Sequence, residues 1–288
     1  MGRGFQLIVL PVRAATQLDH ASPVLVLQRI GMATSQDVRR EAYGAKLTGR
    51  SGSASPAASR RRRFYVGMGI VAILVVLIGF SDSITGGVTG RRSLTPLVHI
   101  HAAIFLSWLI LFVVQSSLVS AGRTALHRRL GTASVVLGVA MLWVGFETAV
   151  AGARRGYPGN GDPLGFMIHP LGDLLSFAIL FGAGFWYRRR PEVHKRLMLL
   201  ATVGAMMNAP LSHVHGRLPE AMKANPLSFL LPMVLLLGAS AVYDRLSRGR
   251  IHPVSLWGAI LLFAWGNVRE MVIGPSRAWH QVADLIVR

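Results

Sequence analysis

The feature that most constrains the fold is a series of long apolar runs, separated by short polar breaks, that begins at Phe64 and continues almost to the end of the chain. A helix needs about 17–25 apolar residues to cross the hydrocarbon of a bilayer, and several runs come close to that length. The runs are Phe64–Phe80, Pro96–Val119, Leu130–Ala151, Phe166–Trp186, Leu197–His213, Pro226–Val242 and Ile251–Val268. Because a backbone in lipid must satisfy its own hydrogen bonds, they predict helices and not strands. Whether the last run crosses the bilayer stays open at this point.

The composition indicates the same fold class. Hydrophobic residues make up 52% of the chain and charged residues 15%, against about 25% charged residues in an ordinary soluble domain. We therefore predict an all-α polytopic membrane helix bundle of about seven transmembrane helices, whose partner is the lipid bilayer. The net charge of +19 does not indicate nucleic acid binding, because Lys and Arg stand in short clusters between the apolar runs and form no continuous basic face.

The two polar ends of the chain differ from its apolar middle. Residues 1–59 have no sustained apolar period, and Gly49–Ser59 consists of Gly, Ser, Ala and Pro with one Arg. This composition predicts a disordered segment, because it cannot bury enough apolar surface to fold. Residues 60–275 are expected to form a transmembrane helical domain. Residues 276–288, which include Trp279, are expected to form an interfacial helix.

The distribution of basic residues predicts the orientation in the membrane. One side of the predicted bundle receives far more of them than the other. The richer side has Arg60–Arg63, Arg123, Arg128, Arg129, Arg188–Arg190, Lys195, Arg196, Arg245, Arg248 and Arg250. The poorer side has Arg91, Arg92, Arg154, Arg155, Arg217 and Lys223. The positive-inside rule therefore predicts a multi-pass protein of the bacterial inner (plasma) membrane with its amino terminus in the cytoplasm.

Two stretches of the chain resemble each other. In each, one histidine precedes an apolar helix and a second follows it in a basic loop. His101 and His127 are 26 residues apart, and His169 and His194 are 25 residues apart. Such an interval crosses the membrane once, so each unit places one histidine near the outer face and one at the inner face. The alternative is a coincidence between two hydrophobic hairpins, since basic loops follow from topology in any case.

Ionisable side chains gather near the outer ends of the predicted helices. The members of this layer are His99, His101, His169, His213 and His215, together with Glu147 and Asp173. Ionisable groups at this depth are costly unless they are paired, hydrated or functional, so each is a candidate site residue. His99 and His101 point about 200° apart on a helix. We expect His101 to face the bundle, because it is the one that recurs in the repeat.

The first functional hypothesis is a haem site. Bis-imidazole ligation needs two histidines at matching depth on neighbouring helices, and His101 with His169 offers this outside while His127 with His194 offers it inside. This arrangement resembles the transmembrane di-haem b-type cytochromes that carry electrons from ascorbate or similar donors to ferric iron. The resemblance implies b-type haem held by these four residues and a role in electron transfer. It covers these four positions only.

Other readings of the same residues remain open. A Zn²⁺, Cu or Fe site could use His101, His169, Asp173 and His213, with Glu147 as a further ligand or base, and could activate water as in membrane hydrolases. Because the chain has no cysteine, any cofactor must use His, Met or carboxylate ligands. If no cofactor binds, the histidines are interfacial residues of a transport component or a scaffold without catalytic function. The sequence indicates no particular protein partner.

Several motifs also resemble those of a family of uncharacterised bacterial multi-span integral membrane proteins. The likeness runs from about Phe64 to His215. It rests on the Arg-rich start of the first helix, on Leu97-Val-His-Ile-His101, on His127-Arg-Arg-Leu-Gly131 and on Arg190-Pro-Glu-Val-His-Lys-Arg-Leu-Met-Leu-Leu-Ala-Thr202. It implies a single all-helical membrane domain in which the histidines belong to a shared pattern.

Overall fold

The computed structural model describes residues 56–91, 93–157, 161–225 and 227–288, with side chains from Arg63 onward. The predicted disordered segment lies outside the described residues, apart from Pro56–Ser59. These residues form the first turn of α3, where the fixed backbone angle of proline suits a helix start.

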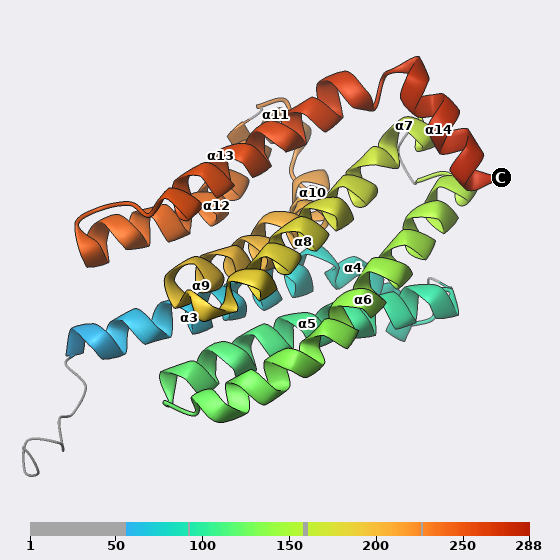
Figure 1. Cartoon of the computed structure of the whole chain (residues 1–288). Helices are drawn as coiled ribbons and strands as arrows, with labels where there is room; N and C mark the ends of the chain where they lie inside the picture. Colours follow the sequence, from blue (N-terminus) through green and yellow to red (C-terminus); the bar gives the residue numbers. More distant parts are fainter. Residues whose placement is uncertain (1–55, 92, 158–160, 226) are drawn as a thin grey trace, which may run out of the picture. The chain divides into compact units, whose positions relative to one another are not determined.

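The described residues fold into a helical bundle, and no strand occurs among them. The elements, which Figure 1 shows, are α3 (Pro56–Gly79), α4 (Ser81–Val88), α5 (Pro96–Ser120), α6 (Thr124–Arg155), α7 (Pro163–Phe166), α8 (Ile168–Trp186), η2 (Tyr187–Arg189), α9 (Pro191–Leu199), η3 (Leu200–Gly204), α10 (Asn208–Gly216), α11 (Glu220–Lys223), α12 (Leu227–Arg248), α13 (Pro253–Val268), η4 (Arg269–Ile273) and α14 (Arg277–Val287). The predicted all-α fold class is confirmed.

The bundle has the helices of a membrane protein. Six helical stretches of the described chain are long and apolar enough to cross a bilayer. They are Pro96–Ser120, Thr124–Arg155, Pro163–Arg189, Pro191–Gly216, Leu227–Arg248 and Pro253–Ile273. A seventh is possible if Arg63–Gly79 and Ser81–Val88, which meet at a bend of 57°, count as one broken span. The run that begins at Ile251 is thus long enough to cross, because the helix continues through η4 as far as Ile273.

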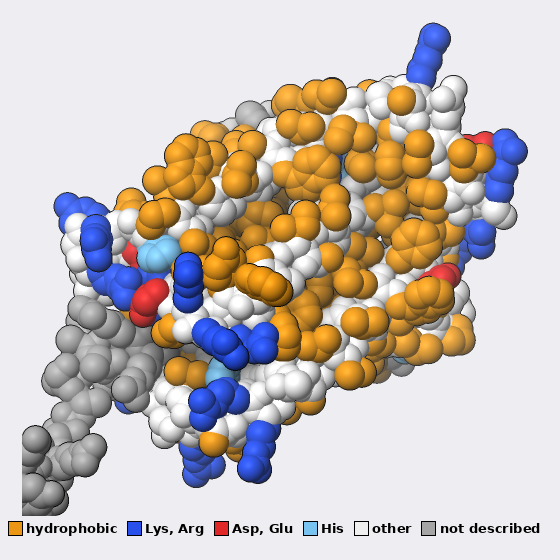
Figure 2. Space-filling view, viewed as in Figure 1, with side chains coloured by type: hydrophobic (Ala, Val, Ile, Leu, Met, Phe, Trp, Pro, Cys, Tyr) orange, Lys and Arg blue, Asp and Glu red, His pale blue; other side chains and the backbone are white. Residues whose placement is uncertain are grey.

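The long helices run back and forth between two ends of the bundle. At one end, on the left in Figure 1, α5 joins α6, α8 joins α9 and α12 joins α13. We call this end the basic end. Figure 2 shows Lys and Arg side chains gathered near this end and a broad field of hydrophobic side chains beside them. This exposed apolar surface is what a protein needs in order to contact lipid chains directly.

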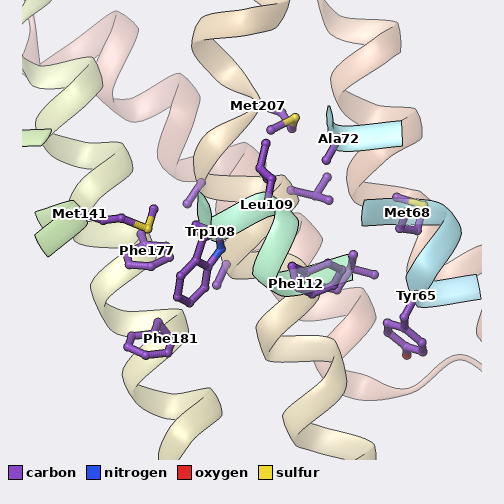
Figure 3. Close-up of a cluster of buried hydrophobic side chains, with 14 of the residues drawn as sticks. Tyr65, Met68, Ala72, Trp108, Leu109, Phe112, Met141, Phe177, Phe181 and Met207 are labelled. Carbon is purple, nitrogen blue, oxygen red and sulfur yellow. The ribbon is translucent and has the colours of Figure 1, made fainter. Parts of the chain in front are cut away.

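Aromatic side chains build the core between α5 and α8. The indole of Trp108 lies edge-on to the rings of Phe177 and Phe181, with ring centroids 4.9 and 5.1 Å apart (Figure 3). Its Nε1 donates a hydrogen bond of 3.2 Å to Oγ1 of Thr202 in η3. The buried polar atom is therefore satisfied, as a tryptophan in a membrane core requires.

Glycines spaced seven residues apart allow α6 to approach its neighbours closely. A Cβ atom at Gly138 would lie 2.7 Å from Cε1 of Phe181, and one at Gly145 would lie 2.6 Å from Cδ2 of Leu174. Small residues at such an interface let the backbone of one helix contact the side chains of the next helix directly. This spacing fixes the register between α6 and α8.

Two helix breaks interrupt the long helices of the bundle. The π-helical turn η3 separates α9 from α10, and after it Met207 is fully buried, while Pro210 contacts the position of Gly79. The burial of Met207 and the contact of Pro210 indicate that the residues before the proline pack against neighbouring helices. At the bend after α3, Arg217 donates to the carbonyl oxygens of Ile78 (2.6 Å) and Gly79. It thereby satisfies carbonyl groups that the broken helix leaves without partners.

The helix expected over residues 276–288 is present as α14. The hydroxyl of Ser276 caps its first turn, and Ala283 is completely buried. The indole of Trp279 donates to the carbonyl oxygen of Leu164 (2.8 Å), and Nε of Arg154 donates to the carbonyl oxygen of Val287 (2.7 Å). The helix is therefore attached to α6 and α7 along its whole length.

Candidate functional site

The structure brings together one of the two predicted histidine pairs. His127 lies in the first turn of α6 and His194 in the first turn of α9, both at the basic end. Their ring centroids are 6.2 Å apart, their planes are inclined by 73°, and both side chains are half-buried. His127 and His194, which the repeat predicts at one depth, are therefore neighbours at this end.

A backbone carbonyl orients the ring of His194. Nδ1 of His194 lies 2.8 Å from the carbonyl oxygen of Gly184, near the end of α8. A carbonyl only accepts, so Nδ1 must carry the proton and donate. In the neutral ring, Nε2 is then unprotonated and able to bind a metal ion. This is the usual orientation of a metal-binding histidine.

A side-chain amide orients the ring of His127. In the orientation that its backbone neighbours require, the amide nitrogen of Gln115 donates to Nδ1 of His127 (2.8 Å), and its oxygen accepts from the backbone N–H of Gly131 (2.8 Å). Gln115 thus joins α5 to α6.

The spacing of the pair suits an ion held between the two rings. When two imidazoles bind one ion from opposite sides through nitrogen–metal bonds of about 2.0–2.1 Å, their ring centres lie roughly 6 Å apart, as in His127 and His194. A direct hydrogen bond, with about 3 Å between the nitrogens, would bring the rings closer. The separation of the two ring centroids therefore matches that of the two imidazoles of a bis-histidine haem.

The other predicted pair is not in ring contact. The ring of His101 stacks on Phe105 at 4.0 Å between centroids, and its Nδ1 is buried without a hydrogen-bond partner among the described residues. The ring of His169 lies against Phe166, and its Nε2 is 3.1 Å from Oε2 of Glu270. As predicted, His101 faces the protein and its neighbour His99 is exposed.

The residues of the alternative metal site make separate contacts. Asp173 is paired with Arg269, the ring of His213 lies 4.7 Å from that of Phe80, and Glu147 is half-buried on α6. In the part of the chain that the structure describes, no three His, Asp or Glu side chains are placed to share a metal ion.

A fully buried ion pair holds three helices together at the basic end. Arg196 of α9 and Asp244 of α12 both have completely buried side chains. Nε of Arg196 donates to Oδ2 of Asp244 (2.9 Å) and to the hydroxyl of Ser255 in α13 (3.1 Å). Nη1 of Arg196 also donates to Oε2 of Glu192 (2.8 Å). The sequence carries no signal for this cluster, because Arg196 stands among the basic residues of a predicted loop and its partner Asp244 lies 48 positions further along the chain.

A second ion pair lies at the opposite end. Nη1 of Arg269 donates to Oδ1 of Asp173 and to the carbonyl oxygen of His169, each at 2.7 Å. The amide of Asn208 donates to Oδ2 of Asp173 (3.3 Å). Gly172 makes room for the guanidinium, since a Cβ there would lie 2.6 Å from Nη1 of Arg269. The position of Asp173 in an apolar run was the sequence signal for this cluster, but its partner was not predicted.

Comparison with protein-family models, with curated proteins and with solved structures finds no match to this chain. The function must therefore be inferred from the geometry of its own residues.

Proposed function

We propose that this protein is an integral membrane electron-transfer protein that holds a b-type haem between His127 and His194. The observation that carries the proposal is the pair of half-buried imidazoles on two helices, with centroids 6.2 Å apart. Bound haem supplies one-electron redox chemistry. His127 and His194 would hold the haem at the basic end of the bundle.

The neighbours of the pair support this role. The carbonyl of Gly184 holds His194 in the tautomer that leaves Nε2 free for iron. Arg128 and Arg129 follow His127 and have exposed side chains, and their charge would pair with the haem propionates. The site therefore offers what a haem needs, which is histidine ligands for its iron and cationic side chains for its propionates.

The orientation is part of the same proposal. The excess of basic residues at the end that carries His127 and His194 favours a cytoplasmic location for this end in a bacterial inner membrane. Electron exchange would then take place on the cytoplasmic side.

A second haem at His101 and His169 is the further part of the di-haem hypothesis. The unpartnered Nδ1 of His101 supports a ligand role, whereas Nε2 of His169 is already held by Glu270. The number of haems per chain, measured together with the histidine variants below, distinguishes one site from two. One haem that is lost in His127→Ala and in His194→Ala assigns this pair alone, and two haems assign both pairs.

The test is the absorption spectrum of the whole protein purified in detergent from haem-replete cells. We expect a Soret band that is lost in His127→Ala and in His194→Ala. The control is His99→Ala, which removes an exposed ring bonded to Thr95 of its own helix and should leave the band unchanged.

Two results would overturn the proposal. One is a colourless wild-type protein from haem-replete cells, and the other is a Soret band that survives both substitutions. A colourless protein that contains stoichiometric Zn²⁺, Cu or Fe, lost in the same two variants, would assign a metal site to the same pair instead.

A further inference from the structure

We propose that Gln115 is a positioning residue that determines which ring nitrogen of His127 carries the proton, and thereby controls how tightly haem binds. The inference rests on the proposed haem site for its consequence, but its structural part concerns the protein alone. Gln115 lies near the end of α5, is half-buried, and reaches the first turn of α6.

Gln115 has little freedom in this position. Its amide nitrogen donates to both Nδ1 and the carbonyl oxygen of His127 (2.8 and 3.2 Å), and its oxygen accepts from the N–H of Gly131 (2.8 Å). Gly131 leaves room for this approach, because a Cβ at that position would lie 3.3 Å from the terminal amide of Gln115. Three hydrogen bonds therefore favour one orientation of the amide.

That orientation gives the two histidines opposite tautomers. An amide nitrogen only donates, so Nδ1 of His127 accepts and the proton of the neutral ring resides on Nε2. His194 has the reverse arrangement, because its Nδ1 donates to the carbonyl oxygen of Gly184. His194 is ready to bind iron through Nε2, and His127 is not.

Haem binding therefore requires the amide of Gln115 to turn over. Its oxygen then accepts from Nδ1–H of His127, and Nε2 of His127 becomes free for iron. The turn places the amide nitrogen against the N–H of Gly131, so the favourable contact with Gly131 is lost. Gln115 thus opposes haem in the empty protein and supports the ligand only after reorientation.

The first test observes the tautomer directly, without haem. The full chain is labelled with ¹⁵N-histidine, purified from haem-deficient cells and examined by NMR, with His127→Ala to assign the signal. We expect His127 to be protonated on Nε2 and His194 on Nδ1. In Gln115→Glu, a carboxylate replaces the donor, so His127 should carry a proton on Nδ1. His194 should be unchanged and serves as the internal reference.

The second test measures haem affinity and midpoint potential. Gln115→Glu should bind haem about ten times more tightly, because removal or reversal of such a supporting hydrogen bond changes affinity by about 10–100-fold. It should also lower the midpoint potential, since a carboxylate makes the imidazole a stronger donor to ferric iron. The control is Asn267→Leu, which removes an amide bonded to Phe263 of its own helix.

The results separate the two proposals. A His127 tautomer that is the same in the wild type and in Gln115→Glu overturns the role of Gln115, whether or not haem binds. A tautomer that shifts as expected in a protein that binds no haem supports the role of Gln115 and overturns the haem proposal.

Discussion

The two buried ion pairs of the bundle differ in how completely they are satisfied. At the basic end, the side chains of Arg196 and Asp244 are both 0% exposed, and Ser255 donates to Oδ2 of Asp244 (2.7 Å). At the opposite end, the side chains of Arg269 and Asp173 are 6% and 17% exposed. Nε of Arg269 is buried without a partner among the described residues.

This difference indicates different roles for the two clusters. A buried charge pair in a low-dielectric interior is stabilising only when hydrogen bonds satisfy its remaining donors and acceptors. The pair at the basic end meets this condition and acts as a fixed joint between α9, α12 and α13. The other pair does not, and one of its members is linked through His169 to Glu270, which is 69% exposed. It is therefore the more easily opened of the two.

The largest expected effect is that of Asp244→Asn. This change removes the buried partner of Arg196 and leaves it with Glu192, whose side chain is 43% exposed, so it should destabilise the protein by about 3 kcal/mol. Unfolding in mixed micelles by titration with sodium dodecyl sulfate measures this loss. Asp284→Asn, which affects an exposed pair with Arg288, is the control and should stay within about 0.5 kcal/mol. Equal effects of the two variants would contradict the assignment of a fixed joint.

The matched change at the other end, Asp173→Asn, should cost less. Arg269 keeps its hydrogen bond to the carbonyl oxygen of His169, so we expect a loss of about 1–3 kcal/mol in the same titration. A loss as large as that of Asp244→Asn would remove the distinction between the two ion pairs.

Gly172→Ala tests how closely Arg269 packs on α8. The added Cβ would lie 2.6 Å from Nη1 of Arg269, and overpacking of this kind costs about 1–3 kcal/mol. The control is Gly182→Ala on the same helix, where no neighbouring atom lies within 4 Å; it should be neutral or slightly stabilising. If the two variants are equally stable, the guanidinium has room to move away.

The smallest expected effect concerns the exposed contact between Asp162 and His280, which lie 2.9 Å apart (Oδ2 to Nε2). The N–H of Gly165, together with His280, lowers the pKa of Asp162, and the carbonyl of Ser276, together with Asp162, raises the pKa of His280. The contribution of Asp162 is present above its unfolded pKa of about 3.9 and is lost as the pH falls. That of His280 is present below its unfolded pKa of about 6.5 and is lost as the pH rises through the folded value.

The contact should therefore stabilise the docked position of α14 most strongly between these two pKa values. We expect a contribution of about 0.2–1 kcal/mol, because both groups are exposed. Hydrogen exchange of the α14 amides at several pH values measures it. Asp162→Asn should remove the pH dependence. If the exchange rates of Asp162→Asn depend on pH in the same way as those of the wild type, the contact is not the source of the pH dependence.

The sequence predicted those parts of the fold that depend on local apolar length. The apolar runs correspond to the observed helices. The last helix is longer than its apolar run predicts, because the run breaks at Arg269 whereas the helix continues through a π-turn as far as Ile273. The repeat interval placed His127 and His194 at one depth, and it placed His101 with His169 in the same way, although the rings of that second pair contact other residues. The partners of Arg196 and Arg269 did not, because each lies on a helix far away in the chain and one sequence carries no signal for such pairing.

The contact of Arg217 with the end of α3 has a consequence for the order of assembly. The guanidinium that donates to the carbonyl oxygen of Gly79 belongs to a residue 138 positions later in the chain. During synthesis, the first helix must therefore enter the membrane with that end unfinished. Its bent geometry is completed only when Arg217, directly after α10, leaves the ribosome, so the end of α3 reaches its final form after α5, α6, α8 and α9 have been synthesised.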